Sequence, residues 1–328
     1  MGLLLGVDAG NSKTIALVAE ENGNILGFGR SGCGDIYNGS SDISIQHVKC
    51  AIQSALEMAG ASIPQLKASS FSMAGADWIE DYQFLRETFE NCGFSNITLV
   101  NDAIGGLRAG SRTGMGVSIV CGTGAAIGAV GNQGQMWHGS FWIRGLWSED
   151  IVKEIYDSVI KAELGIGEPT NLTKRVLEIY QKDNIEAWLF DITSRTGSRR
   201  KESKNIIKAM MQEADNNDPC ANKILEKYAF GCADYALAAA KKVSFQENDL
   251  FDFVYTGGWF RHPSILLNSM IKQKLEPKYK YASHIISPVE PVIGALYLSF
   301  DRLNITVSDT IVDRIKETGP GAVLFETM

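Results

Sequence analysis

The sequence predicts an α/β protein in which one kind of mixed sheet, with helices on its faces, occurs twice. Three short strands are expected at the start of the chain, over 3–8, 13–20 and 24–31, after which helices and strands alternate. A second three-strand pattern appears over 116–140. The length of 328 residues is sufficient for two domains of ordinary size.

The N-terminal half begins with a strand meander and continues with alternating elements. Asn22-Gly23 is a typical turn between the second and third strands. Apolar residues then recur every three or four positions over 44–59, which predicts a helix. The elements expected next are a strand over 69–75, a helix over 79–93, a strand over 96–102 and a helix over 103–112.

The two meanders have the same order of features. Each has an apolar strand, a glycine turn, a second apolar strand, a Gly/Asn turn and a third strand. They are separated by roughly 110 residues, which is too long for a solenoid repeat. We therefore predict one fold duplicated in two domains.

The remainder of the chain is predicted to be mostly helical, with one further strand. Ser148 is expected to cap a helix, and Pro219 lies in the first turn of a long helix over 216–243. The basic stretch 194–204 is predicted to be an exposed loop and helix start, and a contact with a substrate phosphate is the less favoured interpretation. A strand ends at Gly257-Gly258 before a helix from about Pro263, and 288–300 is predicted as the final helix. Gly294 inside that helix indicates close packing against another helix.

Composition limits the classes of partner. A net charge of −7 and a pI near 5.3 argue against nucleic-acid or anionic-membrane binding. The six cysteines lack zinc-ligand spacing, which favours buried thiols in a reducing compartment. The N-terminus has no signal-peptide features, and no apolar run reaches the roughly 20 residues of a membrane span. We expect a cytoplasmic protein without nucleic-acid or membrane partners.

Several predicted strands end in glycines or carboxylates. Gly10 follows Asp8, a Gly122-Thr123-Gly124 turn follows the strand at 116–121, and Asp102 ends another strand. Ligands of α/β sheets bind at the carboxyl ends of strands. Glycine lets the main chain approach phosphate oxygens, and turn N–H groups then hold the anion. The pattern indicates a phosphate-binding site.

Five segments together resemble the actin / sugar kinase / heat-shock chaperone ATPase superfamily. "GVDAGNSKT" and "CGTGAAIG" resemble its two phosphate motifs, and "VYTGGWF" its adenosine motif. "VNDAIGGLRAG" and "PVIGALYLSF" resemble its connecting segments, so the ordered set spans residues 5–300. The "NDA" at 101–103 resembles the corresponding motif of one branch of this superfamily, which contains N-acetylglucosamine kinase and the BadF/BadG-type ATPases.

The resemblance implies a specific architecture. It implies two ribonuclease-H-like domains with ATP and a sugar in the cleft between them. The N-terminal domain would comprise 1–112 plus 290–328, and the C-terminal domain 113–289 with a helical insertion. A homodimer is an open expectation.

The resemblance also implies roles for individual residues. Asp102 would be the general base that takes the proton of the acceptor hydroxyl, and Asp8 would hold Mg²⁺. Read without the resemblance, Asp8 is a turn former, Asp102 is a helix N-cap and the glycines are tight turns. The residues expected to contact ATP are Gly10, Asn11, Ser12, Lys13, Thr14, Gly122, Thr123, Gly124, Gly257 and Gly258.

The sugar-binding part of the resemblance departs from the family pattern. The family's "GWG…GDEGS" segment is "MWHGSFWIRGLWSED" here, without an acidic residue at the family's sugar-binding position. The three tryptophans of this segment are expected to form an aromatic cluster, either a sugar platform or interdomain core. The residues proposed for the sugar are Asp35, Asn38, Asn101, Trp137, Gly139 and Gly145.

The function that follows is ATP-dependent phosphorylation of a sugar or amino sugar, with Mg-ATP between the domains. N-acetylglucosamine, glucosamine or a muramic-acid relative are the expected acceptors. Two alternatives stay open. One is a BadF-type ATPase that activates a partner enzyme, and the other is a sensor that binds sugar and nucleotide without turnover.

Overall fold

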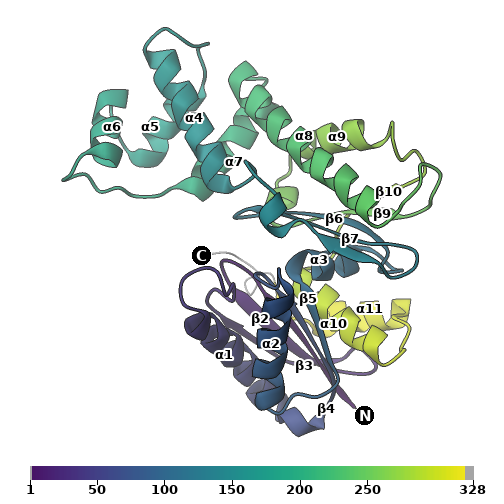
Figure 1. The fold of residues 1–328 in the computed structure, drawn as a ribbon. Helices are drawn as coiled ribbons and strands as arrows, with labels where there is room; N and C mark the ends of the chain where they lie inside the picture. Colours follow the sequence, from purple (N-terminus) through teal and green to yellow (C-terminus); the bar gives the residue numbers. More distant parts are fainter. Residues whose placement is uncertain (1, 322–328) are drawn as a thin grey trace.

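The fold contains two mixed sheets of five strands each (Figure 1). The computed structural model describes residues 2–321. The first sheet has the order β3-β2-β1-β4-β5 and the second has the order β10-β9-β6-β7-β8. The strands of the first sheet are β1 (Leu3–Ala9), β2 (Thr14–Glu20), β3 (Ile25–Ser31), β4 (Leu66–Met73) and β5 (Ile97–Asn101). Those of the second are β6 (Gly116–Cys121), β7 (Ala125–Val130), β8 (Met136–His138), β9 (Asp252–Thr256) and β10 (Ser283–Ile286).

The two sheets repeat one topology. In the first, β1, β2 and β3 form an antiparallel meander, and β1 pairs in parallel with β4. In the second, β6, β7 and β8 form the meander, and β6 pairs in parallel with β9. The predicted duplication and the α/β fold class are confirmed.

Helices cover both faces of the first sheet. Alternate residues of β1 point to opposite faces, so Leu5 and Val7 join one core cluster and Leu4 joins another. The first cluster includes apolar residues of α1 (Ser41–Ala59) and α2 (Ile79–Asn91). The second includes residues of α10 (Pro291–Arg302) and α11 (Asp309–Thr318). The prediction that 288–300 holds the last helix was wrong, because α11 follows it.

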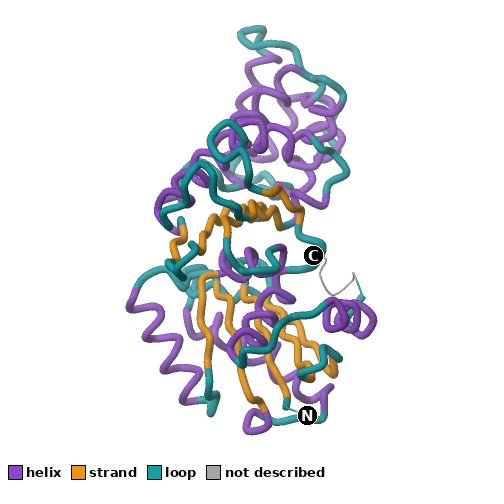
Figure 2. The backbone as a smooth tube through the Cα atoms, turned by 90° about the vertical axis from the view of Figure 1, so that its right-hand side faces the viewer, coloured by secondary structure: helices purple, strands orange, loops and turns teal. Residues whose placement is uncertain are grey.

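The short helix α3 (Asp102–Gly110) lies between the two sheets, which Figure 2 shows one above the other. It contacts β6 and β7 of the second sheet as well as β4 and β5 of the first. Helix α10 packs against it at Gly294, where an added Cβ would lie 2.1 Å from the carbonyl oxygen of Gly105. The predicted close packing at Gly294 is confirmed.

The domain boundaries predicted above stay a prediction. Helices α10 and α11 pack on the first sheet, which agrees with assigning residues from 290 onward to the N-terminal domain. The last part of that assignment, 322–328, lies outside the described residues, as does Met1.

A helical insertion and one further helix accompany the second sheet. These helices are α4 (Ser148–Glu163), α5 (Leu172–Tyr180), α6 (Ile185–Thr193), α7 (Ser203–Asp215), α8 (Pro219–Lys242) and α9 (Leu266–Leu275). The prediction that Ser148 caps α4 was wrong. Trp147 is the N-cap, and the Ser148 hydroxyl instead donates to the carbonyl oxygen of Thr123 at 2.5 Å. Ser148 therefore ties the insertion to the turn after β6.

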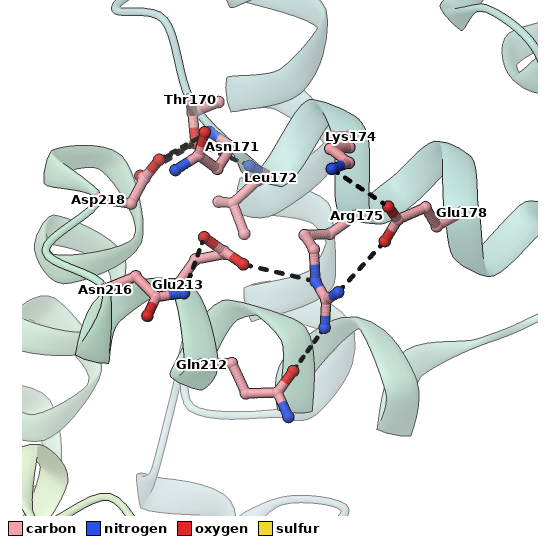
Figure 3. A network of polar contacts seen from close by, with 10 residues as sticks. All are labelled: Thr170, Asn171, Leu172, Lys174, Arg175, Glu178, Gln212, Glu213, Asn216 and Asp218. Atoms are coloured by element: carbon pink, nitrogen blue, oxygen red, sulfur yellow. Dashed lines mark hydrogen bonds and ion pairs between the residues drawn. The ribbon is translucent and has the colours of Figure 1, made fainter.

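A polar network holds α5 against the junction of α7 and α8 (Figure 3). Asp218 caps α8 by accepting from the Ala221 N–H, and it also accepts from the Thr170 hydroxyl and the Asn171 N–H. Arg175 of α5 pairs with Glu213 of α7 at 3.5 Å. Asp218 and Glu213 are both buried, so the network fixes how these helices meet.

Three short 3-10 helices complete the described elements, at Ile63–Gln65, Ser140–Trp142 and Gly258–Arg261. Within 2–321, no helix is long and apolar enough to cross a membrane. All six cysteines are free thiols, and only Cys121 and Cys232 are fully buried.

Candidate functional site

The two predicted phosphate turns meet between the sheets. The β1–β2 turn is closed by a hydrogen bond from the Gly10 N–H to the Lys13 carbonyl oxygen. The hydroxyl of Ser12 in this turn lies 2.9 Å from the hydroxyl of Thr123 in the β6–β7 turn. Residues 111 positions apart are thus hydrogen-bonded, and the two glycine turns face one another.

Aromatic side chains brace the β6–β7 turn. A Cβ added to Gly124 would lie 2.5 Å from the ring of Trp147, so the ring packs directly on this glycine. The indole N–H of Trp259 donates to the Gly122 carbonyl oxygen at 3.0 Å. A Cβ on Gly122 itself would meet nothing within 4 Å. Space is therefore open at the position predicted to meet phosphate.

Two carboxylates, Asp8 and Asp102, lie at strand ends in the same region. Each side chain keeps some exposed surface but is surrounded by protein. This burial is the largest cause that raises the pKa of each carboxyl to about 7. The charge of Asp102 raises the pKa of Asp8 further, and those of Asp77 and Asp35 raise the pKa of Asp102. Four carboxylates thus share one electrostatic environment.

Asp102 is free of the capping role that it could have had. Asn101 is the N-cap of α3, and its side-chain oxygen accepts from the Ala103 N–H at 3.1 Å. The alternative interpretation of Asp102 as the helix cap was therefore wrong. Asn101 also ends β5, so the strand delivers Asp102 to the first turn of α3, where a carboxylate is favoured by the helix dipole.

A cavity of about 400 Å³ opens beside the predicted adenosine motif. Gly257 lines it with φ +101°, and a Cβ there would lie 2.3 Å from the Cys121 carbonyl oxygen. Arg261 and Glu290, which also line it, form an ion pair at 2.7 Å. Burial lowers the pKa of Lys13, and the charge of Glu290 opposes that shift. A charged residue on the cavity wall therefore acts on Lys13 of the β1–β2 turn.

The loop after β3 joins the first turn through side-chain hydrogen bonds. The Asn11 amide donates to Asp35 at 3.0 Å, and the Asn38 amide donates to Asn11 at 2.7 Å. Burial raises the pKa of Asp35. Two predicted sugar residues thus lie beside a predicted phosphate residue. Thr14 differs, because it is fully buried and its hydroxyl donates to the Gly32 carbonyl oxygen.

The predicted cluster of three tryptophans was wrong. Within the described part of the chain, no ring contact joins Trp137, Trp142 and Trp147. Trp137 packs on the core of the second sheet, and Trp142 is 69% exposed. The ring of Phe141 instead contacts rings from the first half of the chain, those of Tyr37 at 5.2 Å and Trp78 at 5.9 Å.

The two remaining predicted sugar residues are glycines near this segment. The Gly139 N–H donates to the Ile127 carbonyl oxygen at 2.7 Å, which joins the end of β8 to β7. Gly145 has φ +73°, with nothing within 4 Å of an added Cβ.

Residues absent from the sequence prediction also occupy the site. Asp77, in the loop after β4, accepts from the Asn101 amide at 2.9 Å and from the Ser140 hydroxyl at 2.7 Å. A carboxylate just past a strand end is the signal that identified Asp8 and Asp102, and Asp77 carries the same signal. Ser140 and Glu290 have no comparable signal in the sequence.

Comparisons with known proteins relate the whole chain to sugar kinases. No protein-family model matches the chain. The chain is 25% identical over 316 residues to N-acetyl-D-glucosamine kinase of Dictyostelium discoideum, covering 91% of this chain and 98% of that protein. It is 24% identical over 234 residues to N-acetylmuramic acid/N-acetylglucosamine kinase of Clostridium acetobutylicum, covering 70% and 76% of the two chains.

Solved structures share the fold. A candidate N-acetylglucosamine kinase from Porphyromonas gingivalis superposes with a TM-score of 0.64 at 15% identity, covering 93% of this chain and 100% of that one. A ROK family glucokinase from Streptomyces griseus, solved with glucose and AMPPNP, gives a TM-score of 0.59 at 16% identity, with coverage of 92% and 100%. The chain is therefore similar to N-acetylglucosamine kinase over nearly its whole length, and it shares the fold of these solved structures.

Proposed function

We propose that this protein phosphorylates a sugar or amino sugar with ATP, and that Asp102 is the general base. The observation that carries the proposal is the position of Asp102. It begins α3 between the two sheets, it is released from capping by Asn101, and it lies within electrostatic reach of Asp8. The two glycine turns that meet at Ser12 and Thr123 supply the adjoining anion site.

The proposed chemistry needs one proton transfer and a held triphosphate. Asp102, ionised, accepts the proton of the acceptor hydroxyl as that oxygen bonds to the γ-phosphorus of ATP and the bond to the β-phosphate oxygen breaks, leaving ADP. The pKa of Asp102, raised to about 7, makes it a stronger base than an exposed aspartate and leaves a large fraction ionised at neutral pH.

Backbone N–H groups of the two turns would bind the phosphates. Asn11, Ser12 and Lys13 contribute from one side, where the Gly10 N–H closes the turn. Thr123 and Gly124 contribute from the other, where the Gly122 N–H donates to the Gly124 carbonyl oxygen. The cavity beside Gly257 and Gly258 would accept the adenosine, with Arg261 on its wall.

The residues present fit Mg²⁺. No group of three or more His, Cys, Asp or Glu side chains in 2–321 forms a complete metal cage. Mg²⁺ in phosphoryl-transfer sites is held by one or two carboxylates, with substrate phosphates and water as the other ligands. Asp8, crowded by Asp102, offers such a carboxylate. When bound, the ion supplies charge neutralisation on the phosphates.

The acceptor would lie near Asp35, Asn38 and Asp102. The two curated relatives are named for N-acetylglucosamine and N-acetylmuramic acid, so these sugars are the first acceptors to test, with glucosamine and glucose beside them. The Asp35 carboxylate and the Asn38 amide are groups that bind sugar hydroxyls.

The test is ADP release across that sugar panel with Mg-ATP, combined with nucleotide binding measured separately. Turnover that depends on one sugar supports the proposal and identifies the acceptor. Tight ATP binding without turnover on any sugar contradicts it.

A further inference from the structure

A chain of hydrogen bonds crosses between the two halves of the molecule and ends beside Asp102. Asp77 and Tyr82 come from the first half, in the β4–α2 loop and in α2. His138 ends β8 of the second sheet, and Ser140 follows it. The Ser140 hydroxyl lies 2.5 Å from His138 Nδ1 and 2.7 Å from Asp77 Oδ1. His138 Nε2 lies 3.4 Å from the Tyr82 hydroxyl.

The chemistry of these groups fixes the direction of the chain. Asp77, when ionised, only accepts, so the Ser140 hydroxyl donates to it. His138 Nδ1 must then carry the proton and donate to Ser140. Burial lowers the pKa of His138, which favours the neutral ring, and Nε2 then accepts from Tyr82. Every donor therefore points toward Asp77.

Asp77 is also linked to α3 through Asn101. Its Oδ1 also accepts from the Asn101 amide at 2.9 Å. The oxygen of the same Asn101 side chain accepts from the Ala103 N–H and caps α3. Asp102 lies between Asn101 and Ala103, so the bonds to Asp77 fix the backbone on both sides of it.

The second half of the molecule holds its end of the chain in a defined position. Ser140 has φ +37°, an uncommon value for a residue with a side chain. Its neighbour Phe141 packs on Tyr37 and Trp78 of the first half. The ring contacts of Phe141 and the hydrogen bond of Ser140 thus both hold Ser140 beside Asp77.

We propose that Ser140 and Asp77 are positioning residues, through which the second half of the molecule aligns Asp102 for proton transfer. The proposal rests on the proposed function, in which Asp102 is the base. Contact across the two halves would then set the catalytic geometry, and small misplacements of a reacting group reduce rate strongly.

The experiment compares Ser140→Ala, Asp77→Ala and Asp77→Asn with Glu80→Gln. Glu80 is an exposed acidic residue three positions from Asp77 and serves as the matched control. The amide oxygen of Asp77→Asn can still accept from Asn101 and Ser140. We expect kcat to fall about 10–10²-fold in both alanine variants, with a smaller change in the KM for the sugar. Asp77→Asn should recover most of the rate, and Glu80→Gln should match wild type.

Hydrogen exchange of the same proteins gives a readout that does not need activity. We expect faster exchange of the amides of residues 101–106 in Ser140→Ala and Asp77→Ala, and no change in Glu80→Gln. Wild-type turnover with unchanged kcat in both alanine variants overturns the positioning role, as does Asp77→Asn as impaired as Asp77→Ala. If the wild type turns over no sugar, the proposed function fails, and unchanged exchange at 101–106 then overturns the hydrogen-bond chain itself.

Discussion

At the scale of single residues, the proposed chemistry depends mainly on the carboxylates between the sheets. Burial, and after it repulsion from neighbouring carboxylates, raise the pKa values of Asp8 and Asp102 from 3.8 to about 7. A cation near Asp8 would offset part of that repulsion. The site is therefore arranged for a base that works near neutral pH.

This arrangement predicts the pH dependence of activity. A base must be ionised, so kcat/KM should level off at pH values well above 7 and fall as pH drops through about 7, where half of Asp102 is protonated. At saturating Mg²⁺ the ion would keep Asp8 ionised, so the measured value should belong to Asp102. A rate profile at saturating Mg²⁺ checks this, and an acidic limb near pH 4 would contradict it.

Substitution of Gly122 can distinguish a role in phosphate binding from a role in folding. A methyl group at this position meets nothing within 4 Å, so Gly122→Ala should leave Tm unchanged. It should raise the KM for ATP, because the methyl group occupies the space where phosphate would approach the backbone. Gly257→Ala, which places Cβ against the Cys121 carbonyl, should lower Tm as well.

Steady-state kinetics and thermal unfolding of the two glycine variants make the comparison. An unchanged KM for ATP in Gly122→Ala would remove this turn from the nucleotide site.

At the scale of elements, the crossing of α3 and α10 links the fold to the site. Gly294→Ala would place a methyl group 2.1 Å from the Gly105 carbonyl oxygen, so the helices must move apart. We expect a loss of about 1–3 kcal/mol in the free energy of unfolding, and a lower kcat because α3 begins at Asp102. Gly231→Ala in α8 is the control, because its neighbour is the flexible end of Leu146. Equal stability of the two variants in denaturant unfolding would refute this prediction.

A second prediction at this scale concerns Asp218, which joins α8 to the segment before α5. It caps the 24-residue α8 and accepts from Thr170 and Asn171, so Asp218→Ala removes the cap and leaves those donors unpaired. A loss of about 1–2 kcal/mol is expected, with the KM for ATP and for sugar unchanged. An unaltered Tm, or a change in either KM, would count against a purely structural role.

The elements that could be predicted from the sequence are those with sharp local signals. The two meanders carry glycine turns and apolar alternation, and the duplicated sheets followed from them. The way in which the insertion divides into α4 to α7 was not predicted from the sequence, and α11 was missed. Ser148 is a good capping residue by type, but its hydroxyl is used by Thr123 across the tertiary structure.

The site divides in the same way. Asp8, Asp102 and the glycine turns are local motifs, so they could be predicted as site residues from the sequence, and the structure brings the two turns together. Ser140, Glu290 and Phe141 acquire their positions from contacts between distant segments, with Asp77, Arg261 and Tyr37 respectively. Periodicity and spacing along one chain do not encode such contacts, so these residues needed the structure.

At the scale of the whole molecule, one topology used twice places two glycine turns opposite each other. A helix that contacts both sheets carries Asp102 between them. Two connecting helices cross at glycines, and an insertion braces the second turn through Trp147 and Ser148. The duplication thus forms a single site from two halves, and we infer that ATP and sugar bind where the halves meet.

The most direct measurement is the mass of the sugar after incubation with Mg-ATP, for wild type, Asp102→Asn and Asp309→Asn. Asp309 is exposed, forms a surface ion pair with Arg112 and serves as the charge-matched control. The account predicts a sugar that gains one phosphoryl group with wild type and Asp309→Asn, and a rate about 10²–10⁴-fold lower with Asp102→Asn, which still binds ATP. An unmodified sugar with wild type, or full turnover with Asp102→Asn, would contradict it.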